Sequence, residues 1–238
     1  MGSTSKRSSA ATAMADRRRP GHPPWFPWQG VASEQLPRLA ELDVNFSPPE
    51  LPKAATGSWR IDDYLQALPS EPPGPPTPEG AFGAARRLID RYEFADPSTV
   101  KAWFVLEATP VGRDMLLELR WHVLSFRVGV RVTEVFDERR QVDGRPVQVW
   151  GWAYQTLEGH VERGQMSYEV WKWLDSGTVE FRIHVVSQFA AVRNPGLRIG
   201  FRAVGRREQV AFARRCCARM ETLVLAAGRE SGVTVGQP

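Results

Sequence analysis

The sequence has few of the residues that bind metals or form disulfides. Its two cysteines, Cys216 and Cys217, are adjacent, and on a helix adjacent side chains point about 100° apart and do not reach disulfide geometry. The four histidines, His22, His122, His160 and His184, are scattered without metal-site spacing. No phosphate loop, nucleotide fingerprint or serine elbow is present. We therefore expect reduced cysteines, no metal and no cofactor.

Long apolar runs are also missing. No stretch approaches the roughly 18 apolar residues of a membrane span, and the N-terminus lacks the apolar centre of a signal peptide. The formal charge of +4 arises within the first twenty residues, which are rich in arginine, so the rest of the chain is close to neutral. This excludes a domain-wide basic footprint for nucleic acid. A cytoplasmic protein is expected.

Composition divides the chain into four segments. Residues 1–44 are predicted to be a disordered tail that is basic at its start and contains the run HPPWFPW at 22–28. Residues 45–79 form a proline-rich extension that packs on the domain, and within it residues 58–68 form a short strand or a helix. Residues 80–228 form the folded domain, and residues 229–238 a flexible C-terminus.

Helical spacing is found near both ends of the folded domain. A helix is predicted after Pro78, with Thr77 as its cap, and a short helix is predicted from Asp96 and Pro97. A long helical region opens at 194–195, is interrupted at Gly205 and continues to about Ala227. Its expected buried stripe is Val210, Ala213, Cys217, Met220 and Val224.

Between the helices the chain alternates apolar and polar residues with period two. Strands are predicted at 115–122, 125–138, 147–156, 164–174 and 178–188. Asp143 and Gly144 are a two-residue hairpin signal, and a tight turn is expected at 175–177. Such short connections predict an antiparallel meander.

The third and fourth of these strands form a hairpin centred on Gly159 and His160. This register places residue 152 opposite 168 and residue 154 opposite 166, so these four side chains lie on one face of the sheet. The proline-rich segments are expected to cover the other face, which carries large rings near small residues.

These elements predict an α+β helix-grip fold, in which a curved antiparallel sheet packs on a long C-terminal helix. Such a sheet often leaves an apolar cavity beside the helix, and a ligand pocket would measure roughly 300 Å³ or more. The candidate lining residues are Trp152, Tyr154, Tyr168, Phe181 and Ile183. The alternative is that the same side chains fill the space completely.

The hairpin loop resembles a family of uncharacterised bacterial and plant proteins known by a domain-of-unknown-function label. The matching residues are Tyr154, Thr156, Leu157, Gly159, His160 and Gly164, and Gln165 stands where the family usually has glutamate. The resemblance covers roughly residues 80–225. The family is similar in layout to the START and polyketide-cyclase superfamily, which implies a helix-grip fold and a hydrophobic ligand.

Three functions are consistent with these observations. The first is binding of a small hydrophobic or lipid-like molecule by the lining residues together with Thr156 and His160. The second is an enzyme with His160 and Thr156 at the pocket mouth, where Glu158 or Glu162 orients the histidine. The structural alternative is that both residues only anchor the loop. The third is an interaction protein that contacts a membrane surface or anionic partner through the basic tail and Arg214, Arg215 and Arg219.

Overall fold

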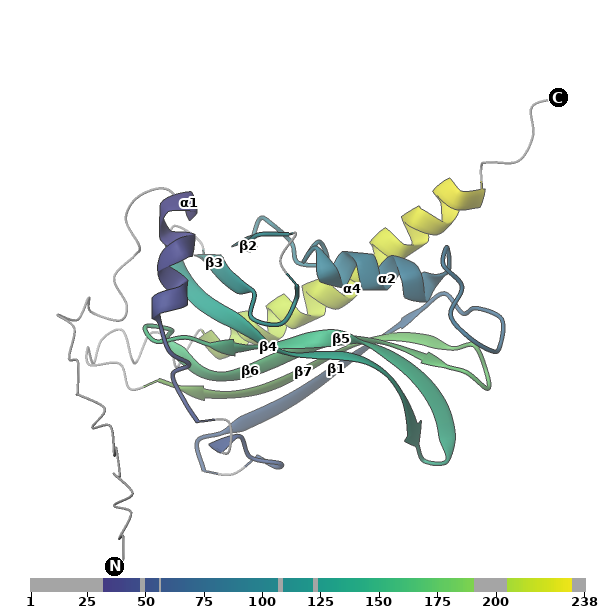
Figure 1. Cartoon of the computed structure of the whole chain (residues 1–238), viewed down its shortest axis with the longest axis horizontal. Coiled ribbons are helices and arrows are strands. Elements are labelled where there is room, and N and C mark those ends of the chain that lie inside the picture. Colours follow the sequence, from purple (N-terminus) through teal and green to yellow (C-terminus); the bar gives the residue numbers. More distant parts are fainter. Residues whose placement is uncertain are drawn as a thin grey trace, which may run out of the picture.

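A seven-stranded antiparallel sheet forms the centre of the computed structural model, which describes residues 32–47, 50–55, 57–106, 109–121, 124–190 and 205–232. The strand order is β1-β7-β6-β5-β4-β3-β2. The sheet curves around the long helix α4, and α2 lies beside α4 on the same face (Figure 1). The predicted helix-grip architecture is therefore confirmed.

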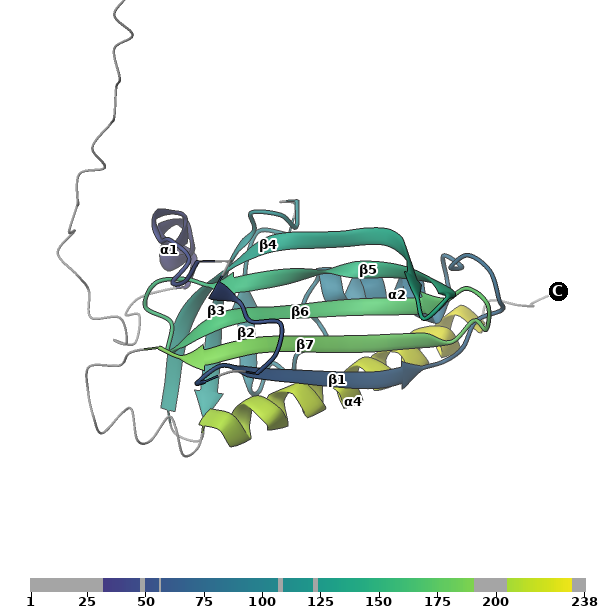
Figure 2. The same cartoon turned by 90° about the horizontal axis from the view of Figure 1, so that it is seen from below.

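The bounds of the elements follow the chain in order. The helices are α1 (Ala32–Gln35), the 3-10 helix η1 (Leu36–Glu41), α2 (Ala81–Asp90) and α4 (Arg206–Gly232). The strands are β1 (Arg60–Leu68), β2 (Val100–Trp103), β3 (Asp114–Trp121), β4 (Leu124–Val142), β5 (Arg145–Thr156), β6 (Glu162–Trp173) and β7 (Val179–Phe189). From β2 to β7 the strands form a meander, of which β3 to β7 were predicted. Figure 2 shows α4 crossing behind β1.

The β4–β5 connection has the predicted two-residue hairpin. Asp143 and Gly144 both adopt positive φ, at 51° and 75°, which the turn that best fits twisted strands requires. The same pair of strands carries a register shift between Val132 and Glu134. Because a bulge bends the strand that contains it, this irregularity helps β4 to curve around the core.

The β5–β6 hairpin has the predicted register. Trp152 lies opposite Tyr168 and Tyr154 opposite Met166, and the ring centroids of Trp152 and Tyr168 are 5.2 Å apart. These side chains share the inner face with the apolar positions predicted on β4 and β7. The residues that are buried there are Val128, Val130, Val132, Val179, Phe181, Ile183 and Val185.

Helix α4 closes the inner face and packs mainly against β1 and α2. Four members of its predicted stripe are buried: Ala213, Cys217, Met220 and Val224. Cys216 is buried as well, whereas Val210 is half-buried. Both cysteines are free thiols, and the predicted helix start at 194–195 lies outside the described residues.

Two helix predictions are wrong in detail. Residues 100–103 form strand β2, which pairs with β3, and not a helix. Asp96 caps only a turn before this strand, where its side chain accepts the backbone N–H of Ser98 at 2.9 Å. Helix α2 begins at Ala81, not at Pro78. The backbone N–H of Thr77 donates to Glu71 Oε2 at 3.0 Å, so this residue belongs to the preceding loop.

The N-terminal segment is folded wherever the structure describes it. Residues 32–41 are helical, and Leu39, which is fully buried, packs with Ala32, Leu116 and Leu157 on the outer face of the sheet. The predicted disorder of residues 1–44 is therefore wrong for 32–44, because apolar contacts order this part. The basic start of the tail and the HPPWFPW run lie outside the described residues.

The proline-rich segment has a different place from the predicted one. Its central part is strand β1, which pairs with β7 at one edge of the sheet, so the strand alternative for residues 58–68 is confirmed. The rings on the outer face of the hairpin are covered by arginines instead. The guanidinium of Arg182 lies 3.8 Å from the ring centroid of Trp171, and that of Arg145 lies 4.4 Å from Trp173. Stacking of this kind shields a ring while the charge stays near water.

Candidate functional site

A cavity of about 160 Å³ lies between the inner face of the sheet and the N-terminal half of α4. Its apolar walls are formed by Val100, Leu117, Leu119, Phe126, Met166, Phe189 and Phe212, and its polar lining includes His160, Glu162, Glu208 and Gln209. An apolar cavity of roughly 150 Å³ holds one benzene-sized molecule. The cavity is smaller than a usual ligand pocket, which measures roughly 300 Å³ or more. Its volume matches that of a single ring.

Tyrosine hydroxyls meet where the cavity borders the packed core. Tyr92 and Tyr154, which line the cavity, lie with their hydroxyl oxygens 3.3 and 3.4 Å from that of Tyr168. Tyr168 donates to the sulfur of Met166 at 2.7 Å. Burial raises the pKa of all three phenols, that of Tyr154 to about 12. All three remain protonated near neutral pH, and the hydroxyl groups of Tyr92 and Tyr154 border the cavity.

Thr156 holds the β5–β6 loop together. Its hydroxyl accepts the backbone N–H of Gly164 at 3.0 Å and donates to the side-chain oxygen of Asn45 at 2.7 Å. Gly164 in turn has no room for a side chain, because a Cβ there would lie 2.0 Å from the carbonyl oxygen of Val186. Thr156 is therefore engaged within the loop and is absent from the cavity lining, as the structural alternative predicted.

His160 lines the cavity as a neutral ring. Its Nδ1 accepts the backbone N–H of Glu162 at 2.9 Å, and a ring nitrogen that accepts a hydrogen bond carries no proton. Burial lowers the pKa of His160 to about 4. The proton of the neutral imidazole therefore resides on Nε2, and the ring is a hydrogen-bond donor rather than a cation at neutral pH.

Glu162 is the second ionisable group of the cavity lining, and its carboxyl is hard to ionise. Burial raises its pKa to about 7, with Arg60 and Arg206 opposing the shift and Asp62 adding to it. Its side chain accepts a long hydrogen bond from Gln209, 3.5 Å between Nε2 and Oε2. A carboxyl of this kind changes its charge close to neutral pH, which suits proton exchange or pairing with a cation.

The predicted ligand-binding residues divide into three groups. Tyr154 and His160 line the cavity. Thr156 forms hydrogen bonds that hold the β5–β6 loop. Trp152, Tyr168, Phe181 and Ile183 have exposed fractions of 0, 0, 0 and 1% and fill the core outside the cavity lining.

The sequence reasoning missed Glu162 as a lining residue, because it was considered only as a partner of His160. The available signal was its spacing from Met166 and Tyr168, since even-numbered positions of β6 share the inner face. Phe212 was also missed. It lies one turn before Cys216 on α4 and borders the buried stripe.

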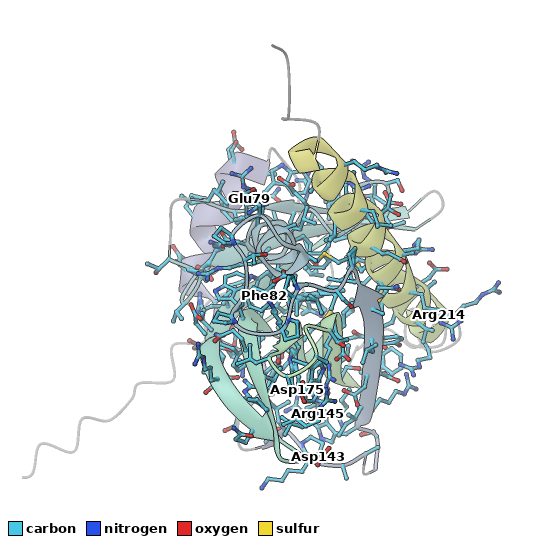
Figure 3. All side chains as sticks on the ribbon, turned by 90° about the vertical axis from the view of Figure 1, so that its right-hand side faces the viewer. Glu79, Phe82, Asp143, Arg145, Asp175 and Arg214 are labelled. Carbon is cyan, nitrogen blue, oxygen red and sulfur yellow. The ribbon has the colours of Figure 1, made fainter. Side chains whose placement is uncertain are left out.

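The three arginines proposed for surface contacts differ in their surroundings. Arg214 is exposed on the outer side of α4 (Figure 3). Arg215 lies 3.7 Å from Glu208, and Arg219 donates to the backbone carbonyl of Glu93 at 3.0 Å.

Among the described residues, no helix is long and apolar enough to span a membrane.

A curved antiparallel sheet that grips a long C-terminal helix and leaves a ring-sized cavity beside it defines a helix-grip protein. The chain belongs to the DUF1990 family, a domain of unknown function, whose model matches residues 46–219. The resemblance found in the loop sequence is thereby confirmed. The match starts before β1, so the family domain includes the edge strand as well as the hairpin and the N-terminal half of α4.

Solved structures with a similar fold are distant in sequence. A Thalictrum flavum norcoclaurine synthase point mutant, in complex with a transition state analogue, is 9% identical with a TM-score of 0.46, over 73% of this chain and 98% of that one. A Thermus thermophilus protein is 10% identical with a TM-score of 0.43, over 71% and 99%. The ginseng major latex-like protein 151 from Panax ginseng is 11% identical with a TM-score of 0.40, over 69% and 99%. A search of curated proteins found no match to the sequence.

Proposed function

We propose that this protein binds a small hydrophobic molecule in the cavity between the sheet and α4. The observation that carries the proposal is an apolar space of about 160 Å³ with polar groups gathered on part of its lining. A well-packed interior leaves few voids larger than a water molecule. The space is roughly ten times the smallest volume that holds one water molecule, and it is partly open to solvent.

The chemistry of the lining supports a ligand with one apolar ring and one polar substituent. Leu117, Leu119 and Phe212 offer apolar contact to the ring. The phenol of Tyr154 and the imidazole of His160 offer hydrogen bonds at fixed positions, and neither carries a charge near neutral pH. Burial of a ring in such a site contributes roughly 25 cal/mol for each Å² of apolar surface removed from water.

The test is calorimetric titration of the purified protein with ring-sized probes such as indole and benzyl alcohol. Phe212→Trp fills part of the cavity and is expected to weaken binding at least tenfold. Leu225→Trp, at an exposed position of the same helix, is the matched control and keeps wild-type affinity. Val100→Phe fills the cavity from the opposite element and serves as a second variant.

Two results would refute the proposal. One is that neither probe binds the wild-type protein at millimolar concentration. The other is that binding occurs but is unchanged in both cavity-filling variants, which would place the ligand elsewhere.

A further inference from the structure

The carboxyl of Glu162 differs from the other charged groups around the cavity in having no close counter-ion. Arg120 pairs with Glu118 at 2.8 Å and Arg215 with Glu208 at 3.7 Å. Arg206 makes two hydrogen bonds to the carboxylate of Asp62. Within the described part of the chain, the side-chain oxygens of Glu162 have one hydrogen-bond donor, Gln209 Nε2, at 3.5 Å.

This arrangement points to the kind of molecule that would complete the site. We propose that the cavity takes a small ring-bearing amine, whose protonated nitrogen pairs with the Glu162 carboxylate while its ring occupies the apolar space. The inference rests on the proposed function and names the ligand class. A buried carboxylate without a cation is costly, and an ammonium group that reaches it supplies both the opposite charge and the missing donors.

The neighbouring groups favour a cation over an anion. His160 is neutral, so it does not compete with the ligand for the carboxylate, and the two arginines of the lining, Arg120 and Arg215, already have acidic partners in Glu118 and Glu208. Arg60, whose charge lowers the pKa of Glu162, has no acidic partner in the described ion pairs, and its guanidinium stacks at 4.9 Å over the ring of Phe189. An anionic ligand would instead place its charge against Glu162.

The proposal predicts a pH dependence, since Glu162 must be ionised to pair with the amine. The groups that face it are Arg60 and Asp62 from β1, Arg206, Glu208 and Gln209 from α4, and His160 from the loop. Burial raises the pKa of Glu162 to about 7, whereas that of His160 is about 4. Affinity for an amine therefore rises between about pH 6 and pH 8, and His160 does not change its charge in this range.

Three probes of nearly the same shape test the ligand class: benzylamine, benzyl alcohol and benzoate. Calorimetric titration at pH 8 is expected to give benzylamine at least tenfold tighter binding than benzyl alcohol, with benzoate the weakest. Glu162→Gln keeps the shape of the side chain and removes the charge, so it is expected to abolish the preference for the amine. Glu158→Gln, at an exposed position of the β5–β6 loop outside the cavity lining, is the matched control and retains the preference.

The pH series in the wild-type protein is an independent readout that needs no variant. Benzylamine binding should tighten at least fivefold from pH 6 to pH 8, while benzyl alcohol binding stays constant. If benzyl alcohol binds as tightly as benzylamine at pH 8, the amine inference is overturned and the hydrophobic site stands. If none of the three probes binds, the proposed function falls and the amine inference falls with it.

Discussion

The ammonium group of Lys172 lies 2.7 Å from Glu71 Oε2, and the two side chains are 0 and 4% exposed. Lys172 also donates to the backbone carbonyl of Pro75 at 2.9 Å, and Glu71 accepts the backbone N–H of Phe82 at 2.8 Å. This single pair therefore joins β6, the proline-rich segment and the first turn of α2. Phe82, labelled in Figure 3, is the second residue of α2 and is itself buried.

Removing the lysine should leave the glutamate buried without its counter-ion. We expect Lys172→Met to lower the free energy of unfolding by about 3–5 kcal/mol, the usual cost of breaking a buried pair from one side. Urea denaturation followed by circular dichroism measures the change. Asp175→Asn, which breaks the exposed pair with Arg145 at 2.7 Å (Figure 3), is the control and should cost far less. Equal losses in the two variants would contradict the structural role of the buried pair.

The hydroxyl of Thr156 should matter more than its methyl group. Thr156→Val keeps the shape but removes the acceptor for Gly164 N–H and the donor to Asn45, so we expect a loss of about 1–3 kcal/mol in unfolding free energy. Thr156→Ser retains the hydroxyl and should cost less than the valine variant. Thermal denaturation of both variants distinguishes the hydrogen bonds from packing. A serine variant as unstable as the valine variant would show that the methyl contacts dominate.

His160 and Glu162 should have opposite effects on stability as pH changes. The pKa of His160 falls on folding from 6.5 to about 4, so its contribution is lost as pH falls from 6.5 to 4. The pKa of Glu162 rises on folding from 4.5 to about 7, so its contribution is lost as pH rises from 4.5 to 7. Between about pH 4.5 and 6.5 the two effects cancel, and the wild-type protein should show a flat stability profile there.

Single variants should reveal each slope. In Glu162→Gln only His160 titrates, so the free energy of unfolding should rise by about 2 kcal/mol from pH 4 to 6.5. In His160→Asn only Glu162 titrates, so the free energy of unfolding should fall by about 2 kcal/mol from pH 4.5 to 7. Both values allow for partial solvent screening. Asparagine is chosen because its side-chain oxygen can accept the Glu162 N–H in place of Nδ1. Urea denaturation at half-unit pH intervals gives the profiles. Variants that both track the wild-type profile would show that these groups titrate normally.

The β-rich half of the molecule was predictable because its signals are local. Alternation placed Trp152, Tyr154, Met166 and Tyr168 on one face, and the loop length fixed their register, so the inner face followed from the sequence. The start of α2 and the nature of residues 100–103 were not predictable in this way. The side chain of Glu71 accepts a hydrogen bond from the backbone N–H of Thr77, six residues later in the sequence. Strand β2 pairs with β3, a contact that the sequence of residues 100–103 does not indicate.

The candidate site was predicted only in part for a similar reason. A period of two identifies which side chains face inward, but it does not distinguish those that touch their neighbours from those that border a space. Trp152 and Phe181 are packed, whereas Tyr154 borders the cavity, and the difference depends on where Phe212 and Gln209 of α4 lie. The effect of burial on Glu162 likewise requires knowing which elements enclose its carboxyl.

The pairing of β1 with β7 sets the order in which the domain can be completed. Among the described residues, strand β1 lies at the sheet edge and pairs with one strand, β7, with Arg60 opposite Ser187. The ribosome therefore releases β1 long before the strand it must join. Contacts between residues so far apart in sequence form slowly. In a nascent chain that ends before residue 179, β1 has no partner strand, and assembly of this edge must wait until the whole meander has been synthesised.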